Sequence, residues 1–278
     1  MGQDQSLPHF PHFPQVNGHQ LEPVSGELDL KGKAVLVLGG AGTIGSGAVF
    51  QFLHHGARVV VVSRHPDQLE KLLAQFPDYV RTSRLYGVVG DYDSKQHVEE
   101  TYEEVKRHLG NGIQLDHVVS TLGPISLGLH SVSKNGMSQS DIQLLHESLE
   151  ENLFPTILAS QVYLKDLKQK EGSTYTIVFG GYGVAAQDTF PGAWAGVVKN
   201  AALEAAISTL ISETKEDKVR VNGCGVHFGI VPAYTKTTNQ YPVQDTNLFA
   251  NVFLKVIQHK DLKGQMIHFN LKEDSEHF

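Results

Sequence analysis

Residues 33–64 read KAVLVLGGAGTIGSGAVFQFLHHGARVVVVSR. The apolar run at 34–38 predicts a parallel strand buried on both faces, and the glycines behind it predict a tight turn into a helix at 46–53. The apolar run at 58–62 predicts a second parallel strand. A strand, a glycine turn, a helix and a strand in this order form a βαβ unit, and we interpret the rest of the chain as built against it.

The glycine turn also predicts a ligand. Gly40, Gly42 and Gly45 have the spacing G-x-G-x-x-G, directly after a strand and directly before a helix. In that context the spacing is typical of dinucleotide binding, because the missing side chains let a pyrophosphate approach the N–H groups at the helix start. We expect the turn to bind the pyrophosphate together with Thr43 and Ile44, which lie between the glycines; a merely flexible loop is the less favoured alternative.

The end of the second strand predicts which dinucleotide is bound. NAD sites usually place an acidic residue there, which accepts hydrogen bonds from the ribose 2′-OH. This chain has Ser63 and Arg64 instead, a hydroxyl beside a guanidinium that suits a 2′-phosphate. The sequence therefore favours NADP(H) as the cofactor over the alternative that Arg64 is a solvated surface charge.

The composition favours one large domain. The chain has 278 residues, of which 40% are apolar and 19% charged, and this suits a single α/β domain at 29–278. Residues 1–28 are rich in Pro, His and Gln and have no helical or strand period, which predicts a disordered or extended N-terminal tail. The net charge of -7, with no basic run, argues against nucleic acid as a partner.

The sequence predicts neither a metal site nor a membrane partner. Cys224 is the single cysteine, so it cannot form an intramolecular disulfide, and no Cys/His cluster has the spacing of a zinc site. No apolar run reaches the length of about eighteen residues that a membrane span needs. We therefore expect a cytoplasmic protein whose partner is a small-molecule substrate.

Periodicity predicts the remaining elements. Helices are expected at 66–76, at 97–109, at 141–170 with an interruption at Pro155, at 197–213 and at 249–258. Strands are expected at 85–89, 116–119, 174–179, 219–226 and 265–269. Six or seven βα alternations predict a doubly wound Rossmann domain with a mostly parallel sheet of six to seven strands.

Two connections and two helices carry further expectations. The polar segment 123–137 and the Pro/Thr-rich segment 229–247 are long for crossover loops, so we expect them at a substrate mouth and in the position of a substrate lid. The helix at 197–213 is rich in alanine, and small side chains permit close helix approach. Together with the helix at 141–170, it is the expected contact surface of a homodimer or homotetramer.

From about residue 30 to residue 270 the chain resembles the short-chain dehydrogenase/reductase (SDR) superfamily. The resemblance rests on the glycine turn, Arg64, Asp91, the segment Ser120-Thr121-Leu122-Gly123, Asn152, and the motifs at 202–205 and 220–222. It implies an oxidoreductase with a nicotinamide cofactor and a small-molecule substrate. The residues that it adds to the cofactor site are Asp91, Tyr92, Thr121, Leu122, Gly123, Gly229 and Val231.

The catalytic residues of the family are missing from their usual positions. The family's chemistry uses a Tyr acid, a Lys one helical turn later that lowers the pKa of the Tyr, and a Ser that orients the substrate oxygen. One register places Asn200 at the Lys position and Gly196 at the Tyr position, and a register shifted by one supplies Lys199 but leaves Ala195. Neither register supplies a tyrosine, so the chain is similar to an atypical branch of the superfamily.

That branch includes fungal SDR-derived reductases that also act as Diels-Alderases. The segment Pro191-Gly192-Ala193-Trp194 and the helix start Asn200-Ala201-Ala202-Leu203-Glu204 carry this looser resemblance. It implies hydride transfer to an iminium or a similarly activated acceptor, in the biosynthesis of a secondary metabolite, and a possible cyclisation assisted by the cofactor. An iminium becomes a neutral amine on reduction, so it needs no acid, whereas a carbonyl would leave a costly buried alkoxide.

Four side chains are the candidates for the reactive end of the site. Trp194 would wall the nicotinamide pocket, with a core position as the alternative, and Tyr182 would act from the Ser position as a weak acid. Asn152 would hold a water or brace its helix, and Lys199 is supplied by one of the two registers. A second hypothesis is a non-catalytic NADP(H)-binding sensor or scaffold, because the usual catalytic trio is absent.

Overall fold

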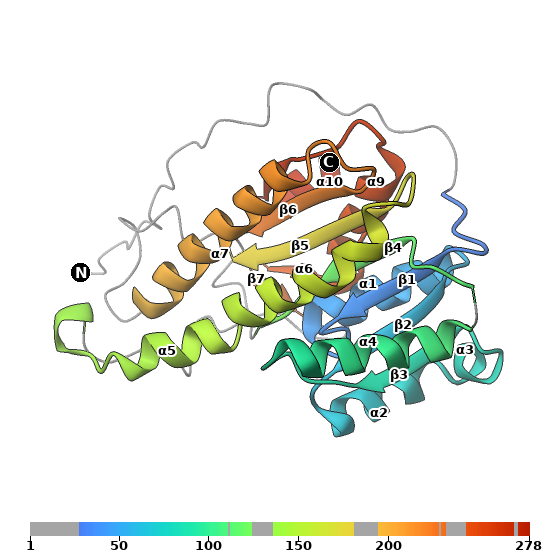
Figure 1. Cartoon of the computed structure of the whole chain (residues 1–278), viewed down its shortest axis with the longest axis horizontal. Helices are drawn as coiled ribbons and strands as arrows, with labels where there is room; N and C mark the ends of the chain where they lie inside the picture. Colours follow the sequence, from blue (N-terminus) through green and yellow to red (C-terminus); the bar gives the residue numbers. More distant parts are fainter. Residues whose placement is uncertain are drawn as a thin grey trace, which may run out of the picture.

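The computed structural model describes residues 28–110, 112–123, 136–180, 194–227, 229–231, 243–269 and 272–278. The central strands are β1 (Ala34–Leu38), β2 (Arg58–Ser63), β3 (Leu85–Val89), β4 (His117–Ser120), β5 (Thr174–Gly180), β6 (Arg220–Val226) and β9 (Met266–Phe269). They form one sheet in the order β3-β2-β1-β4-β5-β6-β9, and every neighbouring pair is parallel (Figure 1). The predicted doubly wound Rossmann domain is confirmed, with seven strands in the sheet.

Ten helices of the described residues connect and cover these strands. They are α1 (Thr43–His54), α2 (Pro66–Gln75), α3 (Pro77–Arg81), α4 (Lys95–Leu109), α5 (Gln143–Glu150), α6 (Leu153–Leu167), α7 (Trp194–Glu213), α8 (Thr246–Phe249), α9 (Asn251–Gln258) and α10 (Lys272–His277). A short 3-10 helix lies at Met137–Gln139. Outside the sheet, β7 (Gly229–Val231) pairs in parallel with β8 (Val243–Asp245).

The unbroken apolar run of β1 follows from burial on both faces. All five of its residues are buried, and they alternate between two core layers: Val35 and Val37 face one layer, whereas Leu36 and Leu38 face the other. Successive side chains of a strand point to opposite faces, so a central parallel strand has no face left for polar residues.

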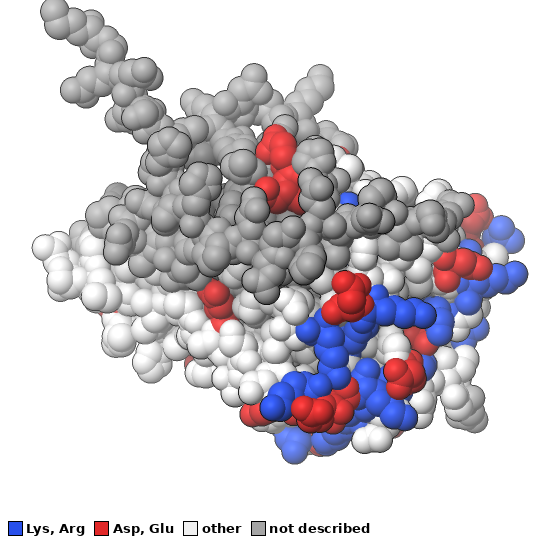
Figure 2. Space-filling model, turned by 90° about the horizontal axis from the view of Figure 1, so that it is seen from above, with Lys and Arg blue, Asp and Glu red and all other residues white. Residues whose placement is uncertain are grey.

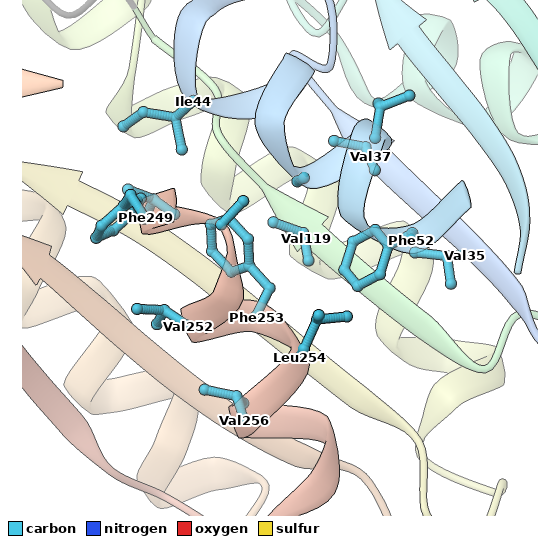
Figure 3. Close-up of a cluster of buried hydrophobic side chains, with 14 of the residues drawn as sticks. Val35, Val37, Ile44, Phe52, Val119, Phe249, Val252, Phe253, Leu254 and Val256 are labelled. Carbon is cyan, nitrogen blue, oxygen red and sulfur yellow. The ribbon is translucent and has the colours of Figure 1, made fainter. Parts of the chain in front are cut away.

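The first core layer lies between the sheet and the helices α1, α2, α8 and α9. Phe52 of α1 and Phe253 of α9 are both buried there against β1 and β4 (Figure 3). The second layer lies between the sheet and α4, α6 and α7, where Tyr163 and Leu203 are buried (Figure 1). Helices therefore cover both faces of the sheet and leave the carboxyl ends of its strands as the place for a ligand.

The order of the strands reverses at β1. β1 lies between β2, which follows it in the chain, and β4, which follows much later. In an open α/β sheet, ligands bind in the crevice outside the carboxyl ends of the strands at such a reversal. The glycine turn at the end of β1 lies at this crevice.

The helix expected at 141–170 is two helices with a break at Glu151 and Asn152. The break precedes Pro155 by several residues, because proline is tolerated in the first turn of a helix, where its missing N–H has no intrahelical partner. Pro155 lies in the first turn of α6. The predicted interruption is therefore real, but it lies before the proline rather than at it.

The remaining differences concern short elements. α3, α8, α10 and the β7–β8 pair were not expected, and α7 begins at Trp194 rather than at residue 197. The expected tail at 1–28, except residue 28, and most of the expected mouth at 123–137 and of the expected lid at 229–247 lie outside the described residues. None of the described helices combines the length and the apolar character that a membrane span requires.

On the described surface, charges of both signs lie close together. Figure 2 shows Lys and Arg gathered in one region of the face seen from above, with Asp and Glu among them. Ion pairs between exposed side chains account for such mixing, for example Lys106–Glu103 within α4 and Lys165–Glu99 between α6 and α4. Exposed pairs of this kind contribute at most about 1 kcal/mol each to stability.

Candidate functional site

A cavity of about 450 Å³ opens at the carboxyl edge of the sheet. Its walls come from the ends of six strands: Gly39 after β1, Val62 and Ser63 of β2, Asp91 after β3, Thr121 after β4, Phe179 and Gly180 of β5, and Val226 of β6. Segments far apart in the chain thus meet at the point where the strand order reverses. The volume is within the range of small-molecule and cofactor sites, about 300–1,000 Å³.

The three motif glycines are each required by a close approach. A Cβ on Gly45 would lie 2.4 Å from the carbonyl oxygen of Gly39, and a Cβ on Gly40 would lie 2.7 Å from a methyl group of Val61. Gly42 lines the cavity, and a Cβ on it would lie 3.2 Å from the Gly39 oxygen. Gly40 and Gly45 therefore let the turn pack, and Gly42 keeps its surface open.

The N-terminus of α1 faces this open surface without a cap. Gly42 is the N-cap residue, and no side chain accepts a hydrogen bond from the first turn. Thr43, Ile44 and Gly45 line the cavity, so their N–H groups and the positive end of the helix dipole are available to an anion. This geometry fits the pyrophosphate of a dinucleotide.

A C-terminal segment holds the turn in place. The hydroxyl of Thr246 donates a hydrogen bond of 2.6 Å to the carbonyl oxygen of Thr43. The two segments approach so closely that a Cβ on Gly47 would lie 2.4 Å from the oxygen of Thr246. The backbone of the predicted pyrophosphate site is thus braced by α8, which sequence analysis did not foresee.

Arg64 and Ser63 lie at the rim of the cavity beside two residues that the sequence did not single out. The Nε of Arg64 donates to the Nε2 of His65 at 3.1 Å, and the Ser63 Oγ accepts from the N–H of His65 at 3.2 Å. His65 and Gln68 also line the cavity. These polar groups at the start of α2 suit a phosphate, because they combine a cation with donors at a helix N-terminus.

Asp91 and Tyr92 lie at the end of β3 on the same side of the cavity. The Asp91 carboxylate accepts the N–H of Tyr92 at 2.7 Å, and the Tyr92 hydroxyl is 3.0 Å from that of Tyr163. Burial raises the pKa of Tyr92 well above its ordinary value, so the phenol stays protonated. Both residues shape the wall, and Tyr92 is not suited to acid catalysis.

Asn152 braces the segment after β4. Its Nδ2 donates to the carbonyl oxygen of Leu122 at 2.9 Å, and it lies so close to Gly123 that a Cβ there would be 2.0 Å from it. Gly123 has φ = 102°, a conformation that favours glycine. The Oδ1 of Asn152 is buried and has no hydrogen-bond partner among the described residues. The side chain thus braces the backbone and keeps one acceptor unused.

Lys199 and Asn200 both line the cavity from α7, so the two sequence registers converge on one place. Lys199 is only 4% exposed, and desolvation lowers the pKa of its ammonium group, an effect that the nearby Glu151 carboxylate opposes. Asn200 packs against Gly180, where a Cβ would lie 2.9 Å from its Nδ2. Lys199 is therefore a buried cation at the reactive end of the cavity.

Four of the predicted site residues lie elsewhere or cannot be placed. Trp194 is partly exposed at the start of α7, its Nε1 has no partner among the described residues, and it does not line the cavity. Gly229 and Val231 pair with β8 and flank Ile230, which does line it. Tyr182 lies outside the described residues.

The described lining also contains residues that sequence reasoning missed. His65, Gln68 and Glu151 line the cavity next to expected residues. The sequence did offer a signal for them, because His65 and Gln68 closely follow Arg64 and Glu151 directly precedes Asn152. Tyr92 is the one tyrosine in the described lining, and neither Ala195 nor Gly196 supplies an acid one turn before Lys199 or Asn200.

Comparison with known proteins agrees with this architecture. The family described as short chain dehydrogenase matches residues 33–247. A "Dehydrogenase/reductase SDR family protein 7-like" of Dictyostelium discoideum is 28% identical over 173 residues, which cover 59% of this chain and 51% of that protein. The 17-beta-hydroxysteroid dehydrogenase type 3 of Rattus norvegicus is 27% identical over 157 residues, 55% of this chain and 46% of that protein. The chain thus spans about half the length of these curated relatives.

Solved structures show the same fold. A short chain oxidoreductase from Pseudomonas aeruginosa PAO1, described as containing an atypical catalytic center, superposes with a TM-score of 0.72 at 18% identity, covering 86% of this chain and 96% of that one. ElxO with NADP bound superposes with a TM-score of 0.69 at 15% identity, covering 85% of this chain and 96% of that one. At these identities the likeness concerns the fold alone.

Proposed function

Because the chain belongs to the short-chain dehydrogenase/reductase family, we propose that it is an NADP(H)-dependent oxidoreductase that delivers hydride to an activated acceptor without a tyrosine acid. One observation carries the proposal: a single cavity joins an uncapped glycine turn, the Ser63–Arg64 pair and a buried Lys199. An iminium or a similarly activated π-system fits as acceptor, because the described lining offers no tyrosine near Lys199.

The described residues fit a nicotinamide dinucleotide. The open turn at Gly42 and the uncapped start of α1 suit the pyrophosphate, and Asp91 and Tyr92 form the wall beyond it. The bound cofactor would supply a hydride. Thr121, Leu122 and Gly123, whose backbone Asn152 braces, would line the path from the turn to the reactive end.

The proposed choice of NADP(H) over NAD(H) rests on charge. No acidic residue follows β2, where Ser63, Arg64 and His65 line the cavity instead. A 2′-phosphate would bind the Arg64 guanidinium through charge-assisted hydrogen bonds, whereas a 2′-OH would leave this cation without a partner of opposite charge.

Cofactor titration tests this choice. NADPH and NADH are titrated by fluorescence against the wild-type protein and against Arg64→Ala, with Arg107→Ala as the control, because Arg107 is an exposed residue of α4 paired with Glu104. We expect NADPH to bind at least about tenfold more tightly than NADH, and Arg64→Ala to abolish the difference. Equal affinities in the wild-type protein would refute the phosphate assignment.

The mechanism left to this chain is mostly binding and orientation. Lys199 and Asn152 would hold polar atoms of the bound molecules, and the apolar wall of Phe179, Val226 and Ile230 would exclude water from the reacting atoms. The same enclosure would suit a small secondary metabolite and its cyclisation. A loss of about 100-fold on Tyr182→Phe would instead identify Tyr182 as a relocated acid and readmit ordinary carbonyl reduction.

A sensor or scaffold is the second candidate function, supported by the lack of a tyrosine at positions 195 and 196. A sensor would bind NADPH and NADP⁺ with different affinities and would not oxidise NADPH with any iminium or activated carbonyl compound. The loss of reduced nicotinamide is followed by its absorbance. Oxidation of NADPH that depends on such an acceptor would exclude this alternative.

Exposed apolar side chains support the proposed homodimer or homotetramer. Phe154 is 47% exposed and Ile157 37% exposed on α6, and Val198 is 39% exposed on α7. Such side chains on neighbouring helices are typical of a covered surface. Light scattering on the wild-type protein and on Phe154→Arg should show a smaller species for the variant; a monomeric wild-type protein would refute the assembly.

A further inference from the structure

Among the described residues, Lys199 brings a positive charge to the end of the cavity that α7 lines. Lys199 is buried, with 4% of its surface exposed, and makes no hydrogen bond to another described residue. The Oδ1 of Asn152, which lines the same cavity, has no partner either. Lys199 lines the cavity, so an ammonium group there with no acceptor among the described residues is available to an acceptor atom of a bound molecule.

Glu151 only partly balances this charge. It is the one ionisable group of the described residues whose charge acts on Lys199, and it lies at the junction of α5 and α6. Its side chain is exposed and forms no ion pair with another described residue. Both groups line the cavity, but water screens the exposed carboxylate more than the desolvated ammonium group, so of these two charges Lys199 contributes the stronger field.

This field decides between the two kinds of acceptor in the proposed function. An iminium brings a second positive charge close to a desolvated ammonium group, which disfavours its binding. A neutral acceptor that becomes negative on oxygen during hydride addition gains an electrostatic partner at that moment. Stabilisation that appears only as charge develops lowers the barrier of the reaction.

We propose that the acceptor is a neutral α,β-unsaturated carbonyl compound whose oxygen is bound and protonated by Lys199. This inference rests on the proposed function. Hydride adds to the β-carbon, the C=C π bond breaks, and its electron pair moves through the conjugated system to the carbonyl oxygen. The Lys199 ammonium group gives a proton to the oxygen of the resulting enolate and takes one back from the solvent, and the enol then tautomerises to the saturated carbonyl compound, so that NADPH and one proton are consumed for each acceptor reduced.

The acidity of Lys199 fits an enolate better than an alkoxide. An enolate is about as basic as an amine, so an ammonium group can protonate it without a second acid, and a lowered pKa strengthens the donor. A simple ketone would form a much more basic alkoxide, for which the family uses its tyrosine. A single buried lysine therefore suits the conjugated acceptor.

Binding measurements test the charge preference without turnover. Three probes of equal size are titrated by tryptophan fluorescence into the free and the NADP⁺-loaded protein: a nitrophenolate, its neutral methyl ether, and a trimethylanilinium ion. We expect the phenolate to bind at least about tenfold more tightly than the cation. Lys199→Met should abolish the preference while Lys199→Arg retains it, and Lys95→Met, on the exposed start of α4, should leave it unchanged.

The rate of acceptor reduction provides the second test. Cyclohexenone and an N-methyl cyclic iminium salt of the same ring size are compared with NADPH as the reductant. We expect Lys199→Met to lower kcat for the enone by about 100-fold while the Kd for NADPH changes less than about threefold. Enone reduction should fall as the pH rises through the pKa of Lys199, and Glu151→Gln should move this fall to lower pH, because the carboxylate raises that pKa.

Several results would overturn the inference. Tighter binding of the cation, or iminium reduction that is faster than enone reduction in the wild-type protein, would show that the cavity selects cations. Equal losses of NADPH affinity and of turnover in Lys199→Met would show that Lys199 only binds the cofactor. Failure of the proposed function would appear separately, as a lack of NADPH binding, while the phenolate titration of the free protein still reports the charge of the cavity.

Discussion

Replacing single glycines by alanine in two helices should have opposite effects on stability. In α1, a Cβ on Gly45 would lie 2.4 Å from the oxygen of Gly39 and 2.6 Å from the Cα of Gly40, whereas ordinary contacts begin at 3.4 Å. Both neighbours are backbone atoms that cannot rotate away. In α7, a Cβ on Gly196 would meet no atom of the described residues within 4 Å, the neighbouring backbone of its own helix aside.

The magnitude follows from comparing the two variants. Alanine favours a helix over glycine by about 1 kcal/mol, and both variants gain this term. Gly196→Ala should therefore stabilise the protein by about 1 kcal/mol. Gly45→Ala must also separate the turn from α1 by roughly 1 Å, and overpacking of this kind costs about 1–3 kcal/mol. Both variants gain the same helix propensity, so the difference between their free energies of unfolding measures only the cost of the close approach at Gly45, about 1–3 kcal/mol.

The assay is urea denaturation of both variants and the wild-type protein, followed by circular dichroism. Equal slopes of the transitions would show that the midpoints compare stabilities directly. NADPH affinity should also fall in Gly45→Ala, because the turn at the proposed pyrophosphate site is displaced, and should stay unchanged in Gly196→Ala. Equal stabilities of the two variants would refute the argument that Gly45 is required for packing.

Three further predictions concern buried groups outside the cavity. Arg220 donates hydrogen bonds of 2.8–3.1 Å to four carbonyl oxygens around the end of α9. Arg220→Met should therefore lower the free energy of unfolding, measured with urea, by about 3 kcal/mol or more, and a loss under about 1 kcal/mol would contradict this. Burial lowers the pKa of His117 to about 4, so the stability of the folded protein should fall by roughly 3 kcal/mol as the pH drops from about 6.5 to about 4. Thermal denaturation at several pH values measures this fall, and His117→Gln should make it smaller. Burial raises the pKa of the Cys224 thiol to about 12, so maleimide should label it only after unfolding, and rapid labelling of the native protein would refute its burial.

The fold was predictable where local signals agree with tertiary structure. The central residues of β1 and β2 are apolar because both faces of these strands are covered, and Gly40 and Gly45 between the strands let the turn pack against its neighbours. α3, α8 and α10 are short, so their sequences carry too few turns for a helical period. The β7–β8 pair joins three-residue strands that only their neighbours bring together.

The site was predictable in part, where the position of a residue relative to a strand end decides whether it lines the cavity. Ser63 ends β2, Arg64 follows it, and Asp91 lies just beyond β3; because parallel strands end at one edge of the sheet, the sequence order alone places these residues at the cavity. Neighbours on a helix differ by about 100° in direction, so the sequence offered Lys199 and Asn200 as alternatives, yet both line the cavity. Trp194 lies at the first turn of α7 and is not part of the described lining, so its role as a wall residue stays a prediction.

The position of β9 determines when the sheet can be completed. β6 pairs with β5 on one side and with β9 on the other, and β9 is formed by Met266–Phe269, close to the end of the chain. While the chain is being synthesised, the seven residues of β6 therefore keep an unpaired row of N–H and C=O groups, an edge that favours pairing with other chains. Because parallel pairings between distant segments also form slowly, newly made chains should depend on chaperones until β9 docks, and a protein truncated before residue 266 should aggregate even though its glycine turn and α1 are intact.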